Sequence, residues 1–222
     1  MNKLAFVITI LLSQITFAQI IKDTGDFDSV KVFDKINLEL IPSSENKIEL
    51  FGENANEVEL INKNGELKVR LPFGKMLNGD SINAKLYFKN IQAIDANEGS
   101  IVKSNAVFKQ MLLELSAKEG SQIEIKSDLQ RAKIRVITGS VINISGKALN
   151  QEASIGTGGV LEAKNLNTNQ TSVSITTGGS AEVNATDIVD AQVKMGGTIT
   201  IFGKPKQINQ KTVLGGSIIQ SN

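Results

Sequence analysis

Two glutamates, Glu162 and Glu182, are the side chains of this sequence best placed to act as a chemical pair. Each stands four residues after the first glycine of a Gly-Gly pair, so the two occupy equivalent places in successive copies of one pattern. Two carboxylates held one repeat apart could form a glycosidase-like acid pair or half of a calcium site. The alternative, which we favour, is a solvated face on which nearby lysines balance the acids: Lys126, Lys147 and Lys164.

Three threonines form a second pattern. Thr138, Thr157 and Thr177 each precede a glycine at equivalent points of the repeat. Stacked threonines can make a flat array of hydroxyl groups, which would suit ice or carbohydrate. Because no Thr-x-Thr pattern is sustained, we favour an ordinary ladder of β-branched residues with cross-strand hydroxyl bonds.

Asp187 and Asp190 are the third candidate. Parallel β-helix polysaccharide lyases and hydrolases use clustered Asp, Lys or Arg on one exposed face. Arg70, Arg131 and Arg135 are the only arginines, and no spacing requires Arg131 or Arg135 to meet the aspartates. We therefore interpret Asp187 and Asp190 as solvated loop carboxylates.

The composition excludes several other kinds of site. The 222 residues include no Cys and no His, which excludes disulfides, thiolate or imidazole metal sites and a His-based triad. The net charge of +1 gives no electrostatic basis for nucleic-acid binding. We expect no catalytic, cofactor-binding or metal-binding residues, no cofactor and no nucleic-acid partner, and we assign no ligand-binding residues.

A repeat in the C-terminal half sets the positions of all these residues. From residue 99 onward the pattern Gly, Gly or Ser, any, apolar, any, apolar recurs about every 19 residues. Apolar residues also alternate with polar ones before each glycine, except in the last copy, which has Gln210 and Thr212 there. Period-two alternation predicts two short strands per repeat, each with one buried face. A third apolar anchor follows the glycine corner: Val107, Leu129, Leu149, Leu166, Ile188 and Ile208.

Stacking the repeats as coils satisfies this pattern economically. Equivalent residues would then lie about 4.8 Å apart along one axis. The inward column would be Ile123, Ile142, Leu161, Ala181 and Ile199, and the outward column Glu124, Asn143, Glu162, Glu182 and Thr200. Stacked glycines would form a corner that needs positive φ or close backbone approach. We predict an all-β fold, a right-handed parallel β-helix or β-solenoid with coils of about 19–20 residues; a row of antiparallel hairpins is the alternative.

The chain divides into three predicted segments. Residues 1–18 have the order of a secretory signal peptide, with Lys3, a short apolar run and cleavage expected after Ala18. Residues 19–98 form a less regular N-terminal β portion that could cap the solenoid. Residues 99–222 hold the repeats, and we expect 19–222 to be one continuous folded unit. Residues 203–206, with Pro205, could blunt the sheet edge at the other end.

Export follows from the first segment. The apolar run is too short to cross a bilayer, and no later apolar stretch reaches 18 residues, so we expect no transmembrane segment in the mature chain. We predict a protein of the periplasm, the cell surface or the extracellular space. Since the sequence has no Cys, lipid attachment to an N-terminal Cys is not expected.

Three stretches together resemble a known family. They are 27–32 followed by 36–40, then 65–69, and then the ladder of Gly-Ser and Gly-Gly corners from 99–100 to 215–216. They are similar to the Bacteroidetes-type secreted family called putative auto-transporter adhesin, head GIN domain, over about residues 27 to 218. The resemblance implies a β-helical protein of the cell envelope. Many members are lipoproteins, and this chain departs from them in having no Cys.

Two functions remain in competition. The first is an exported, non-catalytic cell-envelope or surface protein that serves as an adhesin-like binding or structural module. Its partner is unknown, with a surface glycan, a protein or a second copy as candidates. The alternative is a β-helical polysaccharide lyase or hydrolase, which requires two exposed carboxylates together with Lys or Arg in one groove.

Overall fold

A computed structural model describes residues 19–221, so the predicted signal peptide lies outside the described residues. Sixteen strands form one sheet that winds through the whole molecule. The elements are β1 (Ile20–Asp23), β2 (Ser29–Val32), β3 (Asn37–Pro42), β4 (Lys47–Phe51), η1 (Ala55–Glu57), β5 (Glu59–Lys63), β6 (Glu66–Arg70), η2 (Phe73–Lys75), β7 (Asn83–Phe88), β8 (Ala93–Ala96), β9 (Ile101–Ala117), β10 (Gln122–Ile137), β11 (Val141–Gly156), β12 (Val160–Ile175), β13 (Ser180–Met195), β14 (Thr198–Phe202), β15 (Gln207–Leu214) and β16 (Ser217–Gln220).

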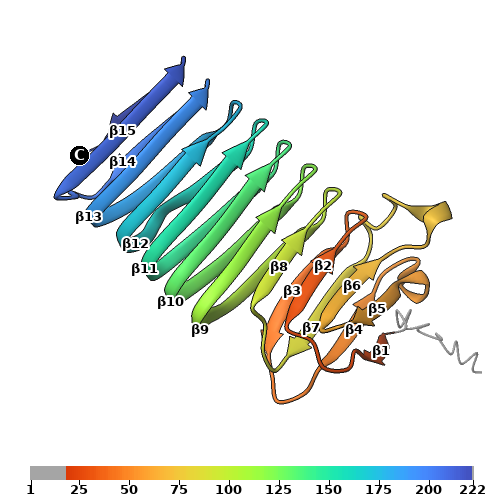
Figure 1. Cartoon of the computed structure of the whole chain (residues 1–222). Coiled ribbons are helices and arrows are strands. Elements are labelled where there is room, and N and C mark those ends of the chain that lie inside the picture. The colour runs from red at the N-terminus through yellow and green to blue at the C-terminus, as the bar shows by residue number, and fades with distance from the viewer. Residues whose placement is uncertain (1–18, 222) are drawn as a thin grey trace, which may run out of the picture.

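The repeats stack as parallel coils of a β-solenoid. Each of the strands β9 to β13 runs from one glycine corner to the next and pairs in parallel with its neighbours (Figure 1). The registers place Ile123 opposite Ile142, Leu161 opposite Ala181, and Ala181 opposite Ile199, so the predicted inward column is confirmed. These side chains are all buried. The antiparallel-hairpin alternative for this half is wrong.

The glycine corners are tight turns in which two successive residues take positive φ. Thr138 has φ 55° and Gly139 has φ 69°, and the Ser140 amide donates to the Ile137 carbonyl at 3.3 Å. This is the geometry of a type I′ turn. The residue after this glycine is serine in some coils and glycine in others, and the reason is steric. Ser121 is buried and donates to the Ala96 carbonyl at 2.7 Å, whereas a Cβ on Gly159 would lie 2.5 Å from the Val136 carbonyl oxygen.

The structure corrects the prediction for the rest of each coil. One strand of 16 or 17 residues spans the coil where two short strands were expected. The six third anchors do not form one column, since Val107 and Leu149 are each 46% exposed while Leu129 and Leu166 are buried. The reason is that the register shifts in mid-coil, so Leu166 pairs with Gly146.

The N-terminal strands continue the solenoid before they close it. β3 pairs in parallel with both β7 and β9, and β2 pairs in parallel with β6 and β8. β1, β4 and β5 pair antiparallel and lie at the far end (Figure 1). The same apolar core extends through both portions. A domain boundary between residues 98 and 99 stays a prediction. Within residues 19–221, no helix is long and apolar enough to cross a membrane.

Candidate ligand-binding groove

A bulge in β9 interrupts the regular stacking and creates the largest hollow described on this molecule. The partners of Glu124 and Lys126 are Lys103 and Val107, so β9 carries two extra residues at this point. The Ser104 hydroxyl donates to the Leu40 carbonyl at 2.7 Å and accepts from the Ala106 amide at 3.3 Å. Bulges of this kind redirect side chains and end strand pairing.

The ladder between β3 and β9 ends at the same place. β3 pairs with β7 along its whole length but with β9 only from Asn37 to Glu39. The bulge groove that results has a volume of about 770 Å³ and crosses β7, β3, β9, β10 and β11. Its polar and aromatic lining is Asn37, Glu39, Phe51, Asn83, Lys85, Lys103, Ser104, Asn105, Glu124, Lys126, Asn143 and Ser145.

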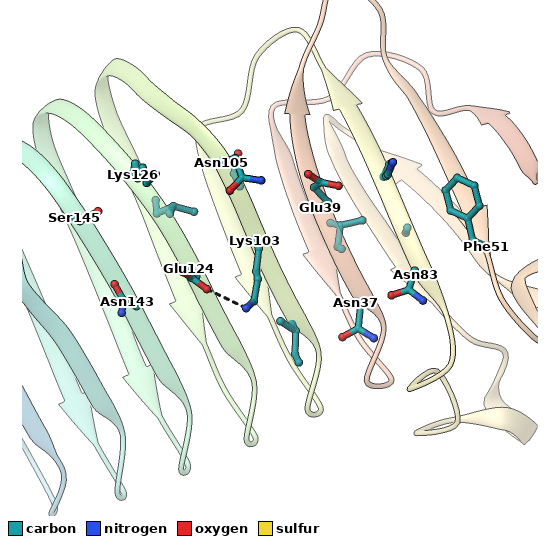
Figure 2. A pocket seen from close by; sticks show the side chains of 16 residues that line it. Asn37, Glu39, Phe51, Asn83, Lys103, Asn105, Glu124, Lys126, Asn143 and Ser145 are labelled. Atoms are coloured by element: carbon teal, nitrogen blue, oxygen red, sulfur yellow. Dashed lines mark ion pairs between the residues drawn. The ribbon is translucent and has the colours of Figure 1, made fainter.

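An ion pair lies in the middle of the groove. Lys103 Nζ is 3.0 Å from Glu124 Oε2, and these side chains are 57% and 58% exposed (Figure 2). Exposed ion pairs contribute little to stability, so both groups can exchange their partner for a ligand. Asn105, on the bulge, and Asn143 lie on either side of this pair (Figure 2). The Asn143 amide donates to Glu162 Oε2 at 2.9 Å.

One aromatic ring, Phe51, lies at the β4 side of the groove (Figure 2). Phe51 is partly exposed, and Lys85 Nζ lies 5.8 Å from its ring centroid. Farther along β7, the Tyr87 hydroxyl donates to Glu49 Oε2 at 3.2 Å. Partial burial, together with the Glu49 carboxylate, raises the pKa of Tyr87 above its ordinary value. The Tyr87 hydroxyl therefore stays a protonated donor at neutral pH.

The comparisons with known proteins agree with this fold. The family model for the putative auto-transporter adhesin, head GIN domain, matches residues 26–205. This chain belongs to that family. None of the curated proteins compared with the chain matches it.

Solved structures share the solenoid. A putative adhesin from Bacteroides fragilis is 17% identical with a TM-score of 0.86, and the match covers 92% of this chain and 97% of that one. A putative adhesin from Parabacteroides merdae is 18% identical with a TM-score of 0.75, covering 93% and 96%. A putative lipid binding protein from Parabacteroides distasonis is 14% identical with a TM-score of 0.70, covering 92% and 96%. At these identities the likeness concerns the fold alone.

The predicted outward column of this head GIN domain is confirmed. Glu162 lies opposite Glu182, which lies opposite Thr200, and Glu124 lies opposite Asn143. Among residues 19–221 no group of three acidic side chains could hold a metal ion. The balancing of the column by Lys126, Lys147 and Lys164 stays a prediction. In the described part of the chain no ion pair joins the column to these lysines, and Lys103 pairs with Glu124.

The threonines occupy the corners, as expected, but their contacts differ. Thr138, Thr157 and Thr177 are exposed. The Thr157 amide donates to the Thr177 carbonyl at 2.6 Å, and the Gly139 amide donates to the Thr157 carbonyl at 3.1 Å. Over the described residues no hydroxyl bond joins the three side chains. The contacts that join these corners are therefore backbone hydrogen bonds.

Asp187 and Asp190 lie within β13 and not in a loop, so the prediction of loop carboxylates is wrong, and both contact the last coil. Lys206 Nζ lies 2.7 Å from Asp187 Oδ1 and lowers the pKa of that carboxyl. The Asn209 amide donates to Asp190 Oδ1 at 2.7 Å. Arg131 lines the same shallow hollow as Asp190, but no ion pair joins them within the described range. Arg135 lies in a different hollow.

That second hollow, of about 580 Å³, contains the residue types that the enzyme alternative requires. Its charges are arranged as a ladder between successive coils. Asp95 pairs with Lys118 at 3.0 Å, and Glu114 pairs with Lys133 at 3.2 Å. Neither the family nor its solved relatives supports the enzyme alternative.

Sequence reasoning missed the bulge groove. Its signal was present as the longest interval between corners, from Gly99 to Gly120, which has two more residues than the next one. A longer interval indicates an insertion, but it does not show which strand from elsewhere in the chain lies beside the inserted residues. The contributions of Phe51 and Asn83 could be seen only once β4 and β7 were placed beside β3.

Proposed function

We propose that this chain is an exported, non-catalytic module of the bacterial envelope or surface that binds a surface glycan in the bulge groove. The observation that carries the proposal is the lining of the groove. Four asparagines, Asn37, Asn83, Asn105 and Asn143, surround the Lys103–Glu124 ion pair, with Phe51 at one side. The adhesin family and its solved relatives support a surface-binding role.

The groove chemistry matches sugar hydroxyls. An asparagine amide offers both a donor and an acceptor, and each sugar hydroxyl can use both. Lysine and glutamate add charge-assisted hydrogen bonds, which are stronger than neutral ones. The face of an aromatic ring such as Phe51 can pack on the apolar side of a sugar ring. The same polar lining disfavours a lipid tail as the ligand, because burying these groups against hydrocarbon would leave them without partners.

Repetition along the sheet favours a polymer over a single sugar. The row that crosses the groove runs from Lys85 through Glu39, Lys103 and Glu124 to Asn143, with one residue per strand. Neighbouring strands lie about 4.8 Å apart. Such a row offers hydrogen-bonding groups at regular intervals, which suits successive sugar units of an extended chain.

Binding of the purified chain to a broad glycan panel tests the proposal, followed by titration calorimetry on any hit. We expect saturable binding that Asn105→Ala and Phe51→Ala weaken at least about tenfold, which corresponds to the loss of one or two good contacts. Asn165→Ala is the matched control, since Asn165 is exposed on β12 outside the groove. Absence of binding across the panel, or binding that the groove variants leave unchanged, would contradict the proposal.

A further inference from the structure

The two ends of the solenoid differ in how well their edge strands are protected against pairing with another chain. At the C-terminal end β15 pairs with β13, and β16 pairs with β14, in both cases on one side only (Figure 1). Within residues 19–221 no strand covers their other side. At the opposite end the edge strands β1 and β5 are short, belong to antiparallel pairs and carry charged residues. Charges and short length are common protection against edge-to-edge pairing.

The open edge presents unused backbone groups on both faces of the solenoid. The Ser217 amide donates to the Gly197 carbonyl at 2.9 Å, and the Leu214 carbonyl accepts from the Gly196 amide at 3.1 Å. Backbone groups of alternate strand residues point to opposite sides. The N–H and C=O groups of Ile218 and Gln220 on β16 therefore point outward. On β15, Val213 is equivalent to Lys118 and Thr176 of earlier coils, whose amides donate back to the preceding coil, so the groups of Gln210 and Thr212 point outward.

This end carries exposed apolar side chains among uncharged polar ones. Val213 is 56% exposed, Leu214 66% and Ile219 49%. Lys211 is the single charged residue of β15 and β16. The segment 203–206, predicted to blunt this edge, does not cover it, because Lys206 is held on Asp187 of β13. An uncharged edge with exposed apolar side chains is a template for pairing with another strand.

We propose that a second copy of this chain docks on this edge. Two identical edges can pair antiparallel about a two-fold axis that runs normal to the two sheets, β15 with β15 and β16 with β16. Such a contact is closed, as most homo-oligomeric contacts are. Head-to-tail stacking is disfavoured, since the opposite end presents short charged strands. With so little charge on β15 and β16, like-charge repulsion across the two-fold axis is small.

Light scattering coupled to gel filtration of the mature chain is the first test. We expect twice the mass of one chain. Gln210→Pro should give a monomer, because proline removes an outward N–H and leaves the bonds between β15 and β13 intact. Gln210→Thr, which keeps that N–H, should stay a dimer. A native chain that is monomeric at high micromolar concentration overturns the proposal, as does a folded Gln210→Pro variant that remains dimeric.

Cross-linking supplies a test that does not depend on a proline variant. The native chain has no Cys, so a single introduced thiol reports one position. Lys211→Cys should form an interchain disulfide on mild oxidation, because it lies near the middle of β15. Met111→Cys is the control, since Met111 is 76% exposed on β9, away from the edge, and should stay unlinked. Equal cross-linking at both positions, or none at Lys211→Cys, contradicts the edge contact. Neither test involves the groove. A failure of the glycan-binding proposal would therefore leave the dimer proposal unaffected, and the reverse also holds.

Discussion

At the scale of single residues, the corners store backbone strain. Thr138 and Thr157 have φ of 55° and 51°, a region that β-branched residues rarely occupy. The left-handed conformation costs a non-glycine residue about 1–2 kcal/mol. Asparagine tolerates it best among the larger residues and is preferred in type I′ turns. The corners of this solenoid are therefore not optimised for stability.

Replacing Thr138 by Asn should raise the free energy of unfolding by about 0.5–1 kcal/mol, because the strain is partly relieved. Urea unfolding followed by circular dichroism measures the change. Thr177→Asn is the matched control, since Thr177 occupies an equivalent corner without positive φ and should gain nothing. A gain at both positions would show that backbone strain is not the cause.

Glu98 makes the free energy of unfolding depend on pH. Burial, together with the nearby carboxylates of Asp34 and Glu119, raises the pKa of Glu98 above its ordinary 4.5. The folded protein thus holds this proton more tightly than the unfolded chain does. Stability falls as the pH rises from about 4.5 through the raised folded value, and the loss is constant above that window.

Glu98→Gln should therefore unfold at higher urea concentration than the native chain at pH 7. At a pH below 4.5 the two should converge, since Glu98 is then protonated in both states. Urea titrations at the two pH values, with Glu124→Gln as an exposed control, measure this. A variant that is less stable than the native chain at pH 7 would mean that ionised Glu98 contributes favourably, which would contradict the expected sign.

At the scale of elements, the bulge in β9 connects folding with the groove. The Ser104 hydroxyl satisfies the Leu40 carbonyl at a position where the ladder from β3 to β9 has ended. A buried carbonyl without a partner costs about 1–3 kcal/mol. The Ser104 side chain therefore allows β3 and β9 to stop pairing without leaving the Leu40 carbonyl unbonded. The end of this pairing opens the groove.

Ser104→Ala should lower the free energy of unfolding by about 1–2 kcal/mol, because the Leu40 carbonyl loses its donor. Glycan binding should weaken as well, since Asn105 is positioned by the same bulge. Ser145→Ala lines the groove without a side-chain bond to the backbone and should change stability by less than about 0.5 kcal/mol. Equal stability of the two variants in thermal or urea melts would remove Ser104 from this role.

At the scale of the whole molecule, the solenoid is a rod with one closed end and one open end. The two interior columns that contain Ala191 and Val193 stay apolar through β13 and end opposite them at Gln210 and Thr212 on β15. Polar residues at terminal inward positions limit exposure of the core, as capping repeats do. These polar residues leave the outer backbone edge of β15 and β16 unpaired. This edge is the proposed dimer contact. Groove and edge lie on different parts of the rod, so a dimer would present two grooves to one polymer.

The amino-acid sequence by itself determined the coils. Alternation at Ile134 and Val136, and glycines about every 19 residues, predicted columns whose members pair as expected. That prediction succeeds because pairing between successive coils is set by a local repeat, and shifting a strand by one residue would turn its apolar face outward. Left-handed corners followed for the same local reason, since glycine is the residue that adopts positive φ most readily.

The tertiary structure alone decided the groove, the ion pairs and the open edge. Ser104 bonds to Leu40, and Phe51 reaches the groove through β7, contacts between segments far apart in the chain. Val107 and Leu149, predicted as third apolar anchors, lie at the surface. Val107 follows the β9 bulge, and the partner of buried Leu129 is Ala148, one residue before Leu149. Lys103 pairs with Glu124 because the register of β9 and β10 places the two residues directly opposite each other. Such contacts depend on how the coils register in space, which a repeat pattern along the chain does not specify.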